Sequence, residues 1–188
     1  KEVRDAVAQG CKRINLTAQD TGCWGIDFGS TLPELLDAVL AVDGNFIVRL
    51  GMANPNFVKL YLPELIRIFK SDKMLKFLHV PVQSGSNRVL KDMRRKYSAD
   101  DFRDIVKAFN KETPDICIST DVIVGYPSET EDDFQQTIEL LKDTRPKIVN
   151  ISKFGSRPRT DAAEMKQIAT EEIKRRSALL HQITESFS

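Results

Sequence analysis

Apolar residues recur along the chain in two different spacings, one typical of strands and one typical of helices. Segments in which every second side chain is apolar predict β-strands, over residues 13–18, 46–50, 75–82, 116–124 and 148–154. Segments in which apolar residues lie three or four positions apart predict helices, over residues 1–9, 32–42, 57–70, 86–95, 99–111, 131–142 and 170–187. Alternation of strand and helix predicts an α/β fold with parallel strands and helical crossovers.

Residues that cap helices mark several of these boundaries. Thr31 precedes one helix, with Pro33 in its first turn and Gly44 just past its end. Thr130 is followed three residues later by Asp133, which is close to a capping box. These signals support the helix assignments independently of the apolar spacing.

The two faces of the predicted strands differ in polarity, because successive side chains point to opposite sides of a strand. One face is apolar and suits packing against helices, as with Leu16, Val48, Val80, Val122 and Ile151. The other face carries polar side chains in strand after strand: Asn15, Thr17, Gln19, Arg49, His79, Gln83, Ser119, Asp121, Asn150 and Ser152.

This polar face decides between architectures. A doubly wound sheet needs apolar strands on both faces, and a closed eight-stranded barrel fills its interior with branched apolar side chains. We therefore predict an incomplete, splayed barrel that is open enough to hold a polar ligand. The alternative is a buried polar network without a ligand, which costs about 1–3 kcal/mol for each unpaired group.

Glycine placement points to the same end of the strands. Gly10 and Gly44 lie in helix-to-strand turns, as ordinary helix caps. The other seven of the nine glycines follow the carboxyl end of a strand: Gly22, Gly25, Gly29, Gly51, Gly85, Gly125 and Gly155. That end carries ligands in barrels and open sheets, so we expect the backbone there to approach a flat ligand closely.

Composition narrows the class of protein. The chain has 188 residues, 41% of them hydrophobic and 29% charged, with a net charge of +1, which suits one soluble globular domain or a large piece of one. A near-neutral balance argues against a dedicated nucleic-acid domain, although it leaves room for a local basic patch such as Arg94, Arg95 and Lys96. No apolar run approaches the ~18 residues of a membrane span.

The cysteines do not suggest a disulfide framework or a metal site. Cys11, Cys23 and Cys117 form no CxxC pair and no even set. We interpret them as reduced, buried, structural thiols of a cytoplasmic protein.

Several segments together resemble a known family of enzymes. LTAQDTGCWGID, RLGMANP, FLHVPVQSGSNRVLKDMRRKY, STDVIVGYPSETEDDFQQT and FGSRPRTDAAEM are similar to the radical S-adenosylmethionine methylthiotransferases. These enzymes attach a methylthio group to tRNA bases or to a ribosomal protein. QDTG and RLGMANP resemble most the archaeal and eukaryotic branch, which acts on N6-threonylcarbamoyladenosine beside the tRNA anticodon.

The resemblance implies a fold and a domain division. It implies a partial (β/α)6 TIM-like barrel, the radical SAM core, over residues 1–160. Residues 161–188 would be a linker and helix leading toward an RNA-binding domain outside the chain. The family's first strand and its CxxxCxxC loop, which binds a [4Fe–4S] cluster, have no counterpart here, and RPRTDAA stands where the family usually has RPGTPAA. We therefore expect a middle section of a larger enzyme, inactive by itself and without metal ligands of its own.

The resemblance also implies roles for individual residues, with S-adenosylmethionine as the cofactor and tRNA as the partner. Gln19 would meet the methionine amino group beside Asp20, Arg88 the cofactor carboxylate, and Ser119 and Asp121 the ribose. The remaining cofactor contacts would be Gln83, Ser84, Val124, Gly125 and Tyr126, and the substrate contacts Arg49 and Arg157.

Each role has a structural alternative. Gln19 suits an ordinary surface turn, Asp20 suits a loop cap, and Arg88 suits a solvated helix position. Asp121 could form an internal ion pair with Arg49, since both point inward, and a buried carboxylate needs a partner. His79 is more consistent with a hydrogen-bonded interior residue than with a catalyst.

Other classes of protein remain open at this point. One is a methylthiotransferase acting on a ribosomal protein, and another is a non-catalytic nucleoside-binding domain. A third is a non-radical barrel aldolase or synthase with a Schiff-base lysine. Lys153 is the only lysine late on a strand, and its alternation places it on the helix-packing face, which argues against that class.

Overall fold

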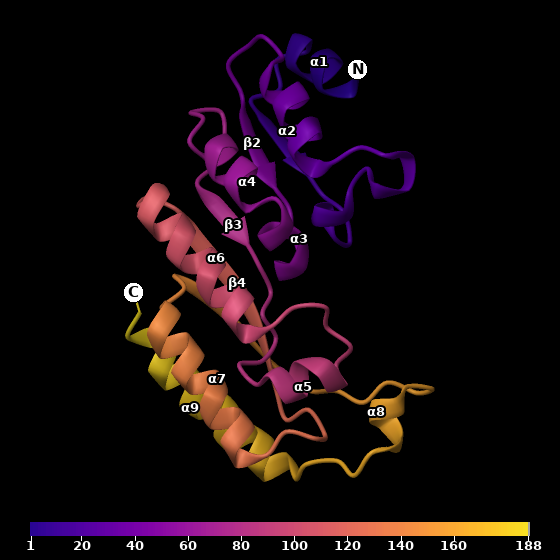
Figure 1. Cartoon of the computed structure of the whole chain (residues 1–188), viewed down its shortest axis with the longest axis vertical. Helices are drawn as coiled ribbons and strands as arrows, with labels where there is room; N and C mark the ends of the chain where they lie inside the picture. Colours follow the sequence, from indigo (N-terminus) through magenta and orange to yellow (C-terminus); the bar gives the residue numbers. More distant parts are fainter. Residues whose placement is uncertain (188) are drawn as a thin grey trace.

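Five parallel strands form the centre of the molecule, in a computed structural model that describes residues 1–187 (Figure 1). They are β1 (Arg13–Leu16), β2 (Ile47–Leu50), β3 (Phe77–His79), β4 (Cys117–Val124) and β5 (Ile148–Lys153). β1 pairs with β2, and β3, β4 and β5 form a second sheet in that order. A single bridge between Val48 and Met74 joins the two sheets, so the sheet is splayed between β2 and β3.

Helices connect the strands and follow the predicted alternation. In chain order they are α1 (Glu2–Ala8), α2 (Leu32–Leu40), α3 (Pro55–Leu60), α4 (Leu62–Phe69), α5 (Asn87–Asp92), α6 (Ala99–Glu112), α7 (Glu131–Thr144), α8 (Asp161–Glu164) and α9 (Thr170–Glu185). Two 3-10 turns, η1 (Thr21–Cys23) and η2 (Ile26–Phe28), lie in the loop after β1.

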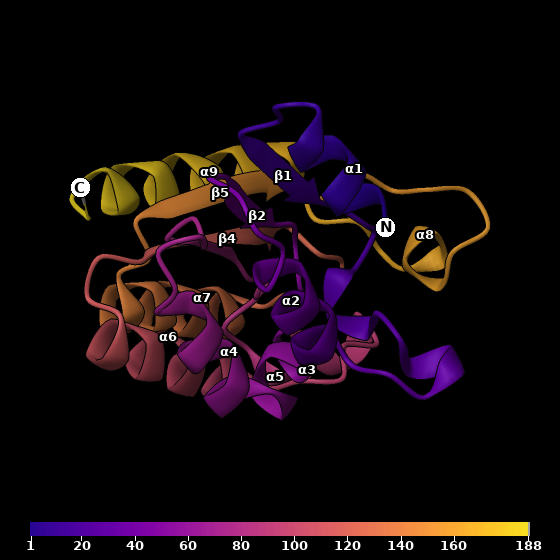
Figure 2. The ribbon, with the colours of Figure 1, turned by 90° about the horizontal axis from the view of Figure 1, so that it is seen from above.

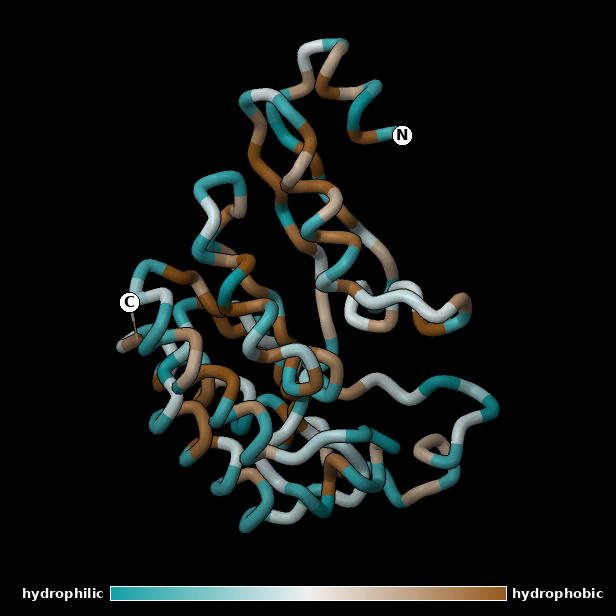
Figure 3. The backbone as a smooth tube through the Cα atoms, turned by 45° about the horizontal axis from the view of Figure 1, so that its top comes forward, coloured by the Kyte–Doolittle hydropathy of each residue, from teal (hydrophilic) through white to brown (hydrophobic). Residues whose placement is uncertain are grey.

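Most helices lie on one side of the strands. Seen from above, α2, α4, α6 and α7 line that side, and α9 runs along β5 (Figure 2). Apolar residues gather between this helical layer and the strands (Figure 3), and the side chains of Val48, Leu78 and Val122 are fully buried there. The opposite strand face, with Arg49, His79 and other polar residues, is only partly covered.

The architecture confirms the predicted partial TIM-like barrel. The strands are parallel, helices cover one face, and no closed barrel forms among the described residues. The barrel stays open because each strand has one apolar face, which is buried against helices, and one polar face, which is not.

Element boundaries differ from the predictions in several places, among them the shorter β1 and α5. The predicted strand 75–82 is reduced to Phe77–His79, since Pro81 lacks the backbone N–H that a longer ladder requires. The predicted helix 57–70 is two helices that meet at Tyr61, ahead of Pro63 in the first turn of α4. The short helix α8 has no counterpart in the predictions.

The predictions for the amino ends of helices are confirmed, whereas Gly44 is not the cap of α2, because the C-cap of that helix is Ala41. Thr31 and Thr130 each accept a hydrogen bond from the third residue of their helix, whose own carboxylate bonds back to the cap, so both form complete capping boxes. Ser98 does the same for α6.

The last helix packs against the rest of the molecule. Leu180 of α9 is fully buried, and Arg176 of α9 pairs with Glu129. The division into 1–160 and 161–188 remains a prediction, and its last residue lies outside the described part of the chain. No helix among residues 1–187 is long and apolar enough to cross a membrane.

Candidate functional site

Three polar side chains from adjacent strands meet on the open face of the sheet. The His79 Nε2 atom lies 3.0 Å from both carboxylate oxygens of Asp121, and the Asn150 amide donates to Asp121 Oδ1 at 2.8 Å. Asn150 is the direct register partner of Asp121 across β4 and β5. Burial raises the pKa of Asp121, but the hydrogen bonds from His79 and Asn150 outweigh it, so that pKa lies below its ordinary value.

The protonation states follow from this geometry. An ionised carboxylate only accepts hydrogen bonds. The Nε2 atom of His79 therefore carries a hydrogen and donates a hydrogen bond to Asp121. His79 is therefore a hydrogen-bonded interior residue, as predicted, and its partner is Asp121.

The predicted pairing of Arg49 with Asp121 is wrong. The guanidinium of Arg49 lies over the ring of Phe77, 5.0 Å from its centroid, and Asp121 bonds to His79 and Asn150 instead. The register explains the difference, because Val48 bridges to Met74, ahead of β3, and Phe77 pairs with Cys117, four residues before Asp121 on β4. Strand alternation gave the face of both residues correctly but not their level along the sheet.

A cavity of about 570 Å³ opens at the carboxyl end of β4 and β5. It is lined by Gln83, Asp121, Ser152 and Arg157, among others, and it has a size typical of small-molecule sites. Gln83 is buried and has a φ of +70°, a conformation that is costly for a residue other than glycine. Its backbone is fixed on both sides by hydrogen bonds with Asp121 and Ile123 of β4.

The structure thus brings Gln83, Asp121 and Arg157 to one cavity. Ser119 lies on the same strand, buried and opposite His79 in the register of β3 and β4. Their roles toward a ligand remain predictions.

Lys153 also lines this cavity, at the end of β5. The prediction that it lies on the helix-packing face is wrong, because it is the last residue of its strand and is exposed there.

Gln19 and Asp20 lie apart from this cavity, after β1 in the other sheet. Gln19 is exposed. The Asp20 carboxylate accepts hydrogen bonds from the backbone of Gly22 and from the side chain of Asn54, at 2.9 and 2.6 Å. Asp20 therefore acts as the loop cap that was its alternative role.

The QSGS segment after β3 packs against α7 and is hydrogen-bonded to it. Ser84 is fully buried near Thr137, and Gly85 donates its backbone N–H to the Thr137 hydroxyl at 2.9 Å. Ser86 donates to Asp133 at 2.6 Å. Ser84 accordingly points into the helical layer, and the small residues here serve the packing of loop against helix.

Arg88 extends the same contact with α7. Its guanidinium bonds to the Asp133 carboxylate, which also accepts from Thr130. Burial raises the pKa of Asp133, but these bonds and the one from Ser86 bring that pKa well below its ordinary value. Arg88 thus has a protein partner in Asp133, and its role toward a cofactor carboxylate stays a prediction.

The segment Val124, Gly125 and Tyr126 leaves β4 at the edge of the site. The Gly125 N–H donates to Glu129 at 2.8 Å, and the Val124 carbonyl accepts from Phe154 at 2.8 Å. The Tyr126 ring packs edge-on against Phe154. The Gly125 N–H and the Val124 carbonyl are thus already hydrogen-bonded within the protein. A flat ligand would therefore meet this segment through apolar contact.

The predicted reason for the strand-end glycines is mostly wrong. A Cβ on Gly125 would lie 2.5 Å from Ile173, one on Gly85 would lie 2.5 Å from Thr137, and one on Gly51 would lie 2.9 Å from the Leu16 carbonyl. These glycines permit close packing of protein against protein. Gly155 lines the cavity and faces open space.

The cysteines offer no place for an iron–sulfur cluster. Cys11 and Cys23 are exposed and Cys117 is partly buried, so the expectation that they are buried is wrong. Within residues 1–187 no three Cys, His, Asp or Glu side chains gather as a metal site. A [4Fe–4S] cluster does not fit the side chains of this chain, and no chemical step is assigned through one here.

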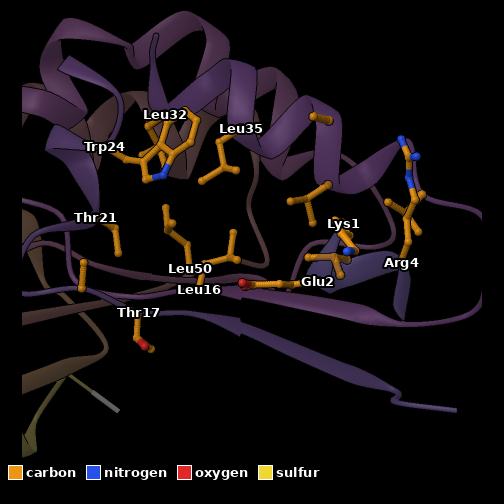
Figure 4. A pocket seen from close by; sticks show the side chains of 15 residues that line it. Lys1, Glu2, Arg4, Leu16, Thr17, Thr21, Trp24, Leu32, Leu35 and Leu50 are labelled. Carbon is orange, nitrogen blue, oxygen red and sulfur yellow. The ribbon is translucent and has the colours of Figure 1, made fainter. Parts of the chain in front are cut away.

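A second cavity, of about 530 Å³, lies between α1, β1 and α2 (Figure 4). Its walls are mainly apolar, with Leu16, Leu35 and Leu50 around the Trp24 ring. It lacks convergent charged or polar groups apart from the chain start, and we assign it no ligand.

The parallel strands, the single helical layer and the polar cavity at the strand ends define a partial barrel with an open polar face. Residues 1–141 match the Radical SAM superfamily, and the chain belongs to it. Among solved structures, the chain is similar to the radical S-adenosylmethionine methyltransferase TsrM from Kitasatospora setae, with a TM-score of 0.61 at 15% identity, over 81% of this chain and 29% of that one. This likeness shows the fold.

Curated relatives are more similar in sequence. The probable threonylcarbamoyladenosine tRNA methylthiotransferase of Pyrococcus horikoshii is 49% identical over 96% of this chain and 43% of its own length. The threonylcarbamoyladenosine tRNA methylthiotransferase of Drosophila melanogaster is 39% identical over 100% of this chain and 34% of its own length. The chain thus spans less than half the length of these relatives. Family membership excludes the non-radical aldolase or synthase.

Proposed function

We propose that the protein carrying this chain is a tRNA methylthiotransferase that uses S-adenosylmethionine to methylthiolate threonylcarbamoyladenosine beside the anticodon. The observation that carries this proposal is the combination of 49% identity to a relative of that name with a polar cavity at the strand ends. A ribosomal-protein substrate has no comparable support, because the relatives from archaea and eukaryotes carry the tRNA name.

The cofactor fits the groups that the cavity presents. S-adenosylmethionine supplies radical and methyl-transfer chemistry when bound, and the protein supplies binding and orientation. Asp121, held ionised by His79 and Asn150, offers fixed acceptors to ribose hydroxyls. Gln83 offers a side-chain amide at the buried end of the cavity.

We propose further contacts to the adenine, to the methionine and to the substrate. Tyr126 flanks the adenine through apolar contact from the adjoining cavity, with Val124 and Gly125 buried behind it, and Gln19 lies at the β1 end, toward the methionine. Arg157 reaches the substrate from the rim of the cavity. The chain covers less than half the length of these relatives, so the proposed activity is that of the whole protein, which would work on tRNA in the cytoplasm.

A direct assay of the product tests the proposal. The full-length protein, reconstituted anaerobically, is incubated with S-adenosylmethionine, sulfide as the source of the inserted sulfur, a reductant and an anticodon stem-loop RNA that contains threonylcarbamoyladenosine. Nucleoside mass spectrometry should show the methylthio derivative of that nucleoside, and an RNA with plain adenosine at the same position should give little product. Equal product from both RNAs, or product only from a peptide substrate, would overturn the proposal.

A further inference from the structure

Arg95 is an arginine without a carboxylate partner in a partly buried position. Its Nε atom is shielded from solvent and has no hydrogen-bond partner within residues 1–187. Arg103, which is also partly buried, pairs with Asp100 and Asp143, and the buried Arg176 pairs with Glu129. A buried donor left unpaired costs about 1–3 kcal/mol, so its persistence calls for an explanation.

The surroundings of Arg95 are a cavity with a positive balance. Arg95 lines the cavity that holds Gln83 and Asp121, together with Lys153 and Arg157. The single carboxylate in that lining, Asp121, is already bonded to His79 and Asn150. No ion pair joins Arg95, Lys153 or Arg157 to any acidic residue of the described chain. Three cations facing one satisfied carboxylate favour an anionic ligand.

The backbone around this region is strained in a way that supports a binding role. Four residues other than glycine have a positive φ, and three of them, Gln83, Arg94 and Arg159, line this cavity or the adjoining one. Both cavities share Arg95. Left-handed residues of this kind cost about 1–3 kcal/mol each and gather at ligand sites.

The turn at Arg94 separates two neighbouring arginines into different environments. Arg94 is exposed and pairs with Asp161, whereas Arg95 faces the cavity. Tyr97 fixes the chain just beyond, because its hydroxyl donates to the Pro81 carbonyl at 3.0 Å. The basic run at residues 94–96 is therefore split, and only its middle member is held toward the cavity.

We infer that Arg95 binds the carboxylate of the amino-acid substituent on the substrate nucleoside. The inference rests on the proposed function, since the threonylcarbamoyl group carries such a carboxylate on a short flexible arm. A guanidinium pairs bidentately with a planar carboxylate. The apolar walls beside Arg95, Ile123 and Phe154, suit the aliphatic part of that arm, and an RNA backbone phosphate has no comparable arm to enter the cavity.

Binding measurements on the full-length, cluster-loaded protein test this assignment. Affinity is measured for three anticodon stem-loop RNAs, with threonylcarbamoyladenosine, with its threonine carboxylate replaced by a carboxamide, and with plain adenosine. Wild type should bind the carboxylate form best. Arg95→Gln should weaken binding of that RNA by about 10- to 100-fold, the loss expected for one charge-assisted hydrogen-bond pair. The same variant should bind the carboxamide RNA as wild type does.

Matched variants separate this role from structural effects. Arg94→Gln removes the same charge one residue away and should keep the wild-type preference, since Arg94 is exposed and bonded to Asp161. Arg95→Lys keeps the charge without the fork and should restore part of the preference, with an unchanged melting temperature as the check on folding. The affinity for S-adenosylmethionine should be the same in all variants.

Three results would overturn the assignment, and they differ from one another. If Arg95→Gln keeps the full preference for the carboxylate RNA, Arg95 does not read that group, while the proposed function stands. If Arg95→Gln weakens only the binding of S-adenosylmethionine, Arg95 serves the cofactor instead. If wild type shows no preference among the three RNAs and makes no methylthio product, the proposed function fails and the inference fails with it.

Discussion

The most buried ion pair of the chain joins Glu129, after β4, to Arg176 of α9. The two side chains are 1% and 6% exposed, and their closest atoms lie 2.7 Å apart. Burial raises the pKa of Glu129 above its ordinary value, although hydrogen bonds from Gly125 and Arg176 work in the opposite direction. The pair fixes α9 to the loop that leaves β4.

Removal of Arg176 should therefore destabilise the fold strongly. Arg176→Ala leaves the Glu129 carboxylate buried without its cation, which typically costs about 3–5 kcal/mol. Arg175→Ala is the matched control, because Arg175 is exposed and forms only surface pairs, and it should leave stability nearly unchanged. Urea denaturation at neutral pH measures both, and equal midpoints for the two variants would contradict the account.

The pH dependence of that loss has a definite sign. A carboxyl group whose pKa is raised in the folded state favours folding at low pH, and this contribution disappears as the pH rises through the folded pKa. Loss of Arg176 removes a contact that lowers this pKa, so the pKa rises further. The deficit of Arg176→Ala relative to wild type should therefore shrink as the pH is lowered from neutral toward the raised pKa, and a constant or growing deficit would contradict this.

At the scale of single residues, the sequence predicted faces better than partners. Alternation along β4 correctly placed Asp121 on the open face, and its need for a partner was also correct. The partner itself, His79 in place of Arg49, depends on the register of β2 against the segment before β3, which strand patterns do not encode. Arg95 was visible only as part of a basic run, because its orientation depends on the left-handed turn at Arg94.

At the scale of elements, the QSGS loop that follows β3 packs against α7, the helix that precedes β5. A Cβ on Gly85 would lie 2.5 Å from the Gln136 carbonyl and from the Thr137 backbone. Neither neighbour is the end of a flexible side chain, so the loop or the helix would have to move.

We expect Gly85→Ala to destabilise the protein by about 1–3 kcal/mol, the usual cost of overpacking. Gly155→Ala is the control, because a Cβ there meets nothing within 4 Å and the residue does not have a positive φ. Thermal unfolding of the two variants side by side is the measurement. A melting temperature for Gly85→Ala that matches that of Gly155→Ala would show that the contact between the QSGS loop and α7 yields easily.

Elements themselves were predicted well, and the errors have local causes. The four strands other than β3 and the long helices α6, α7 and α9 were predicted close to their observed bounds, since periodicity and capping residues agreed there. The strand around Phe77 was predicted too long, and the break at Tyr61 was missed. The strand-end glycines were found, but their contacts with α7, α9 and β1 come from tertiary packing, which sequence spacing does not show.

At the scale of the whole molecule, the described residues form a polar cavity at the strand ends but bring no cluster ligands together. By itself it should not assemble a [4Fe–4S] cluster when treated anaerobically with iron and sulfide, because its described part brings no three cysteines together. Iron analysis after desalting, with absorbance in the visible region, is the measurement. Stoichiometric iron that survives desalting would contradict the account.

We propose that the polar strand ends hold S-adenosylmethionine. Gln83, after β3, and Asp121 of β4 meet at one cavity. A strained backbone fixes Gln83, and hydrogen bonds from His79 and Asn150 fix Asp121. A ligand that uses both should lose affinity when both are truncated, whereas a purely structural pair would affect folding alone.

Titration of S-adenosylmethionine into the full-length, cluster-loaded enzyme tests this claim most directly. Wild type is compared with the double variant Gln83→Ala with Asp121→Ala, and with Arg88→Ala as a control whose guanidinium is bonded to Asp133. We predict that the double variant binds at least about tenfold more weakly, since one charge-assisted and one neutral hydrogen-bonding group are lost, and that Arg88→Ala binds as wild type does. Unchanged affinity in a folded double variant would contradict the account and show that the polar strand ends are structural.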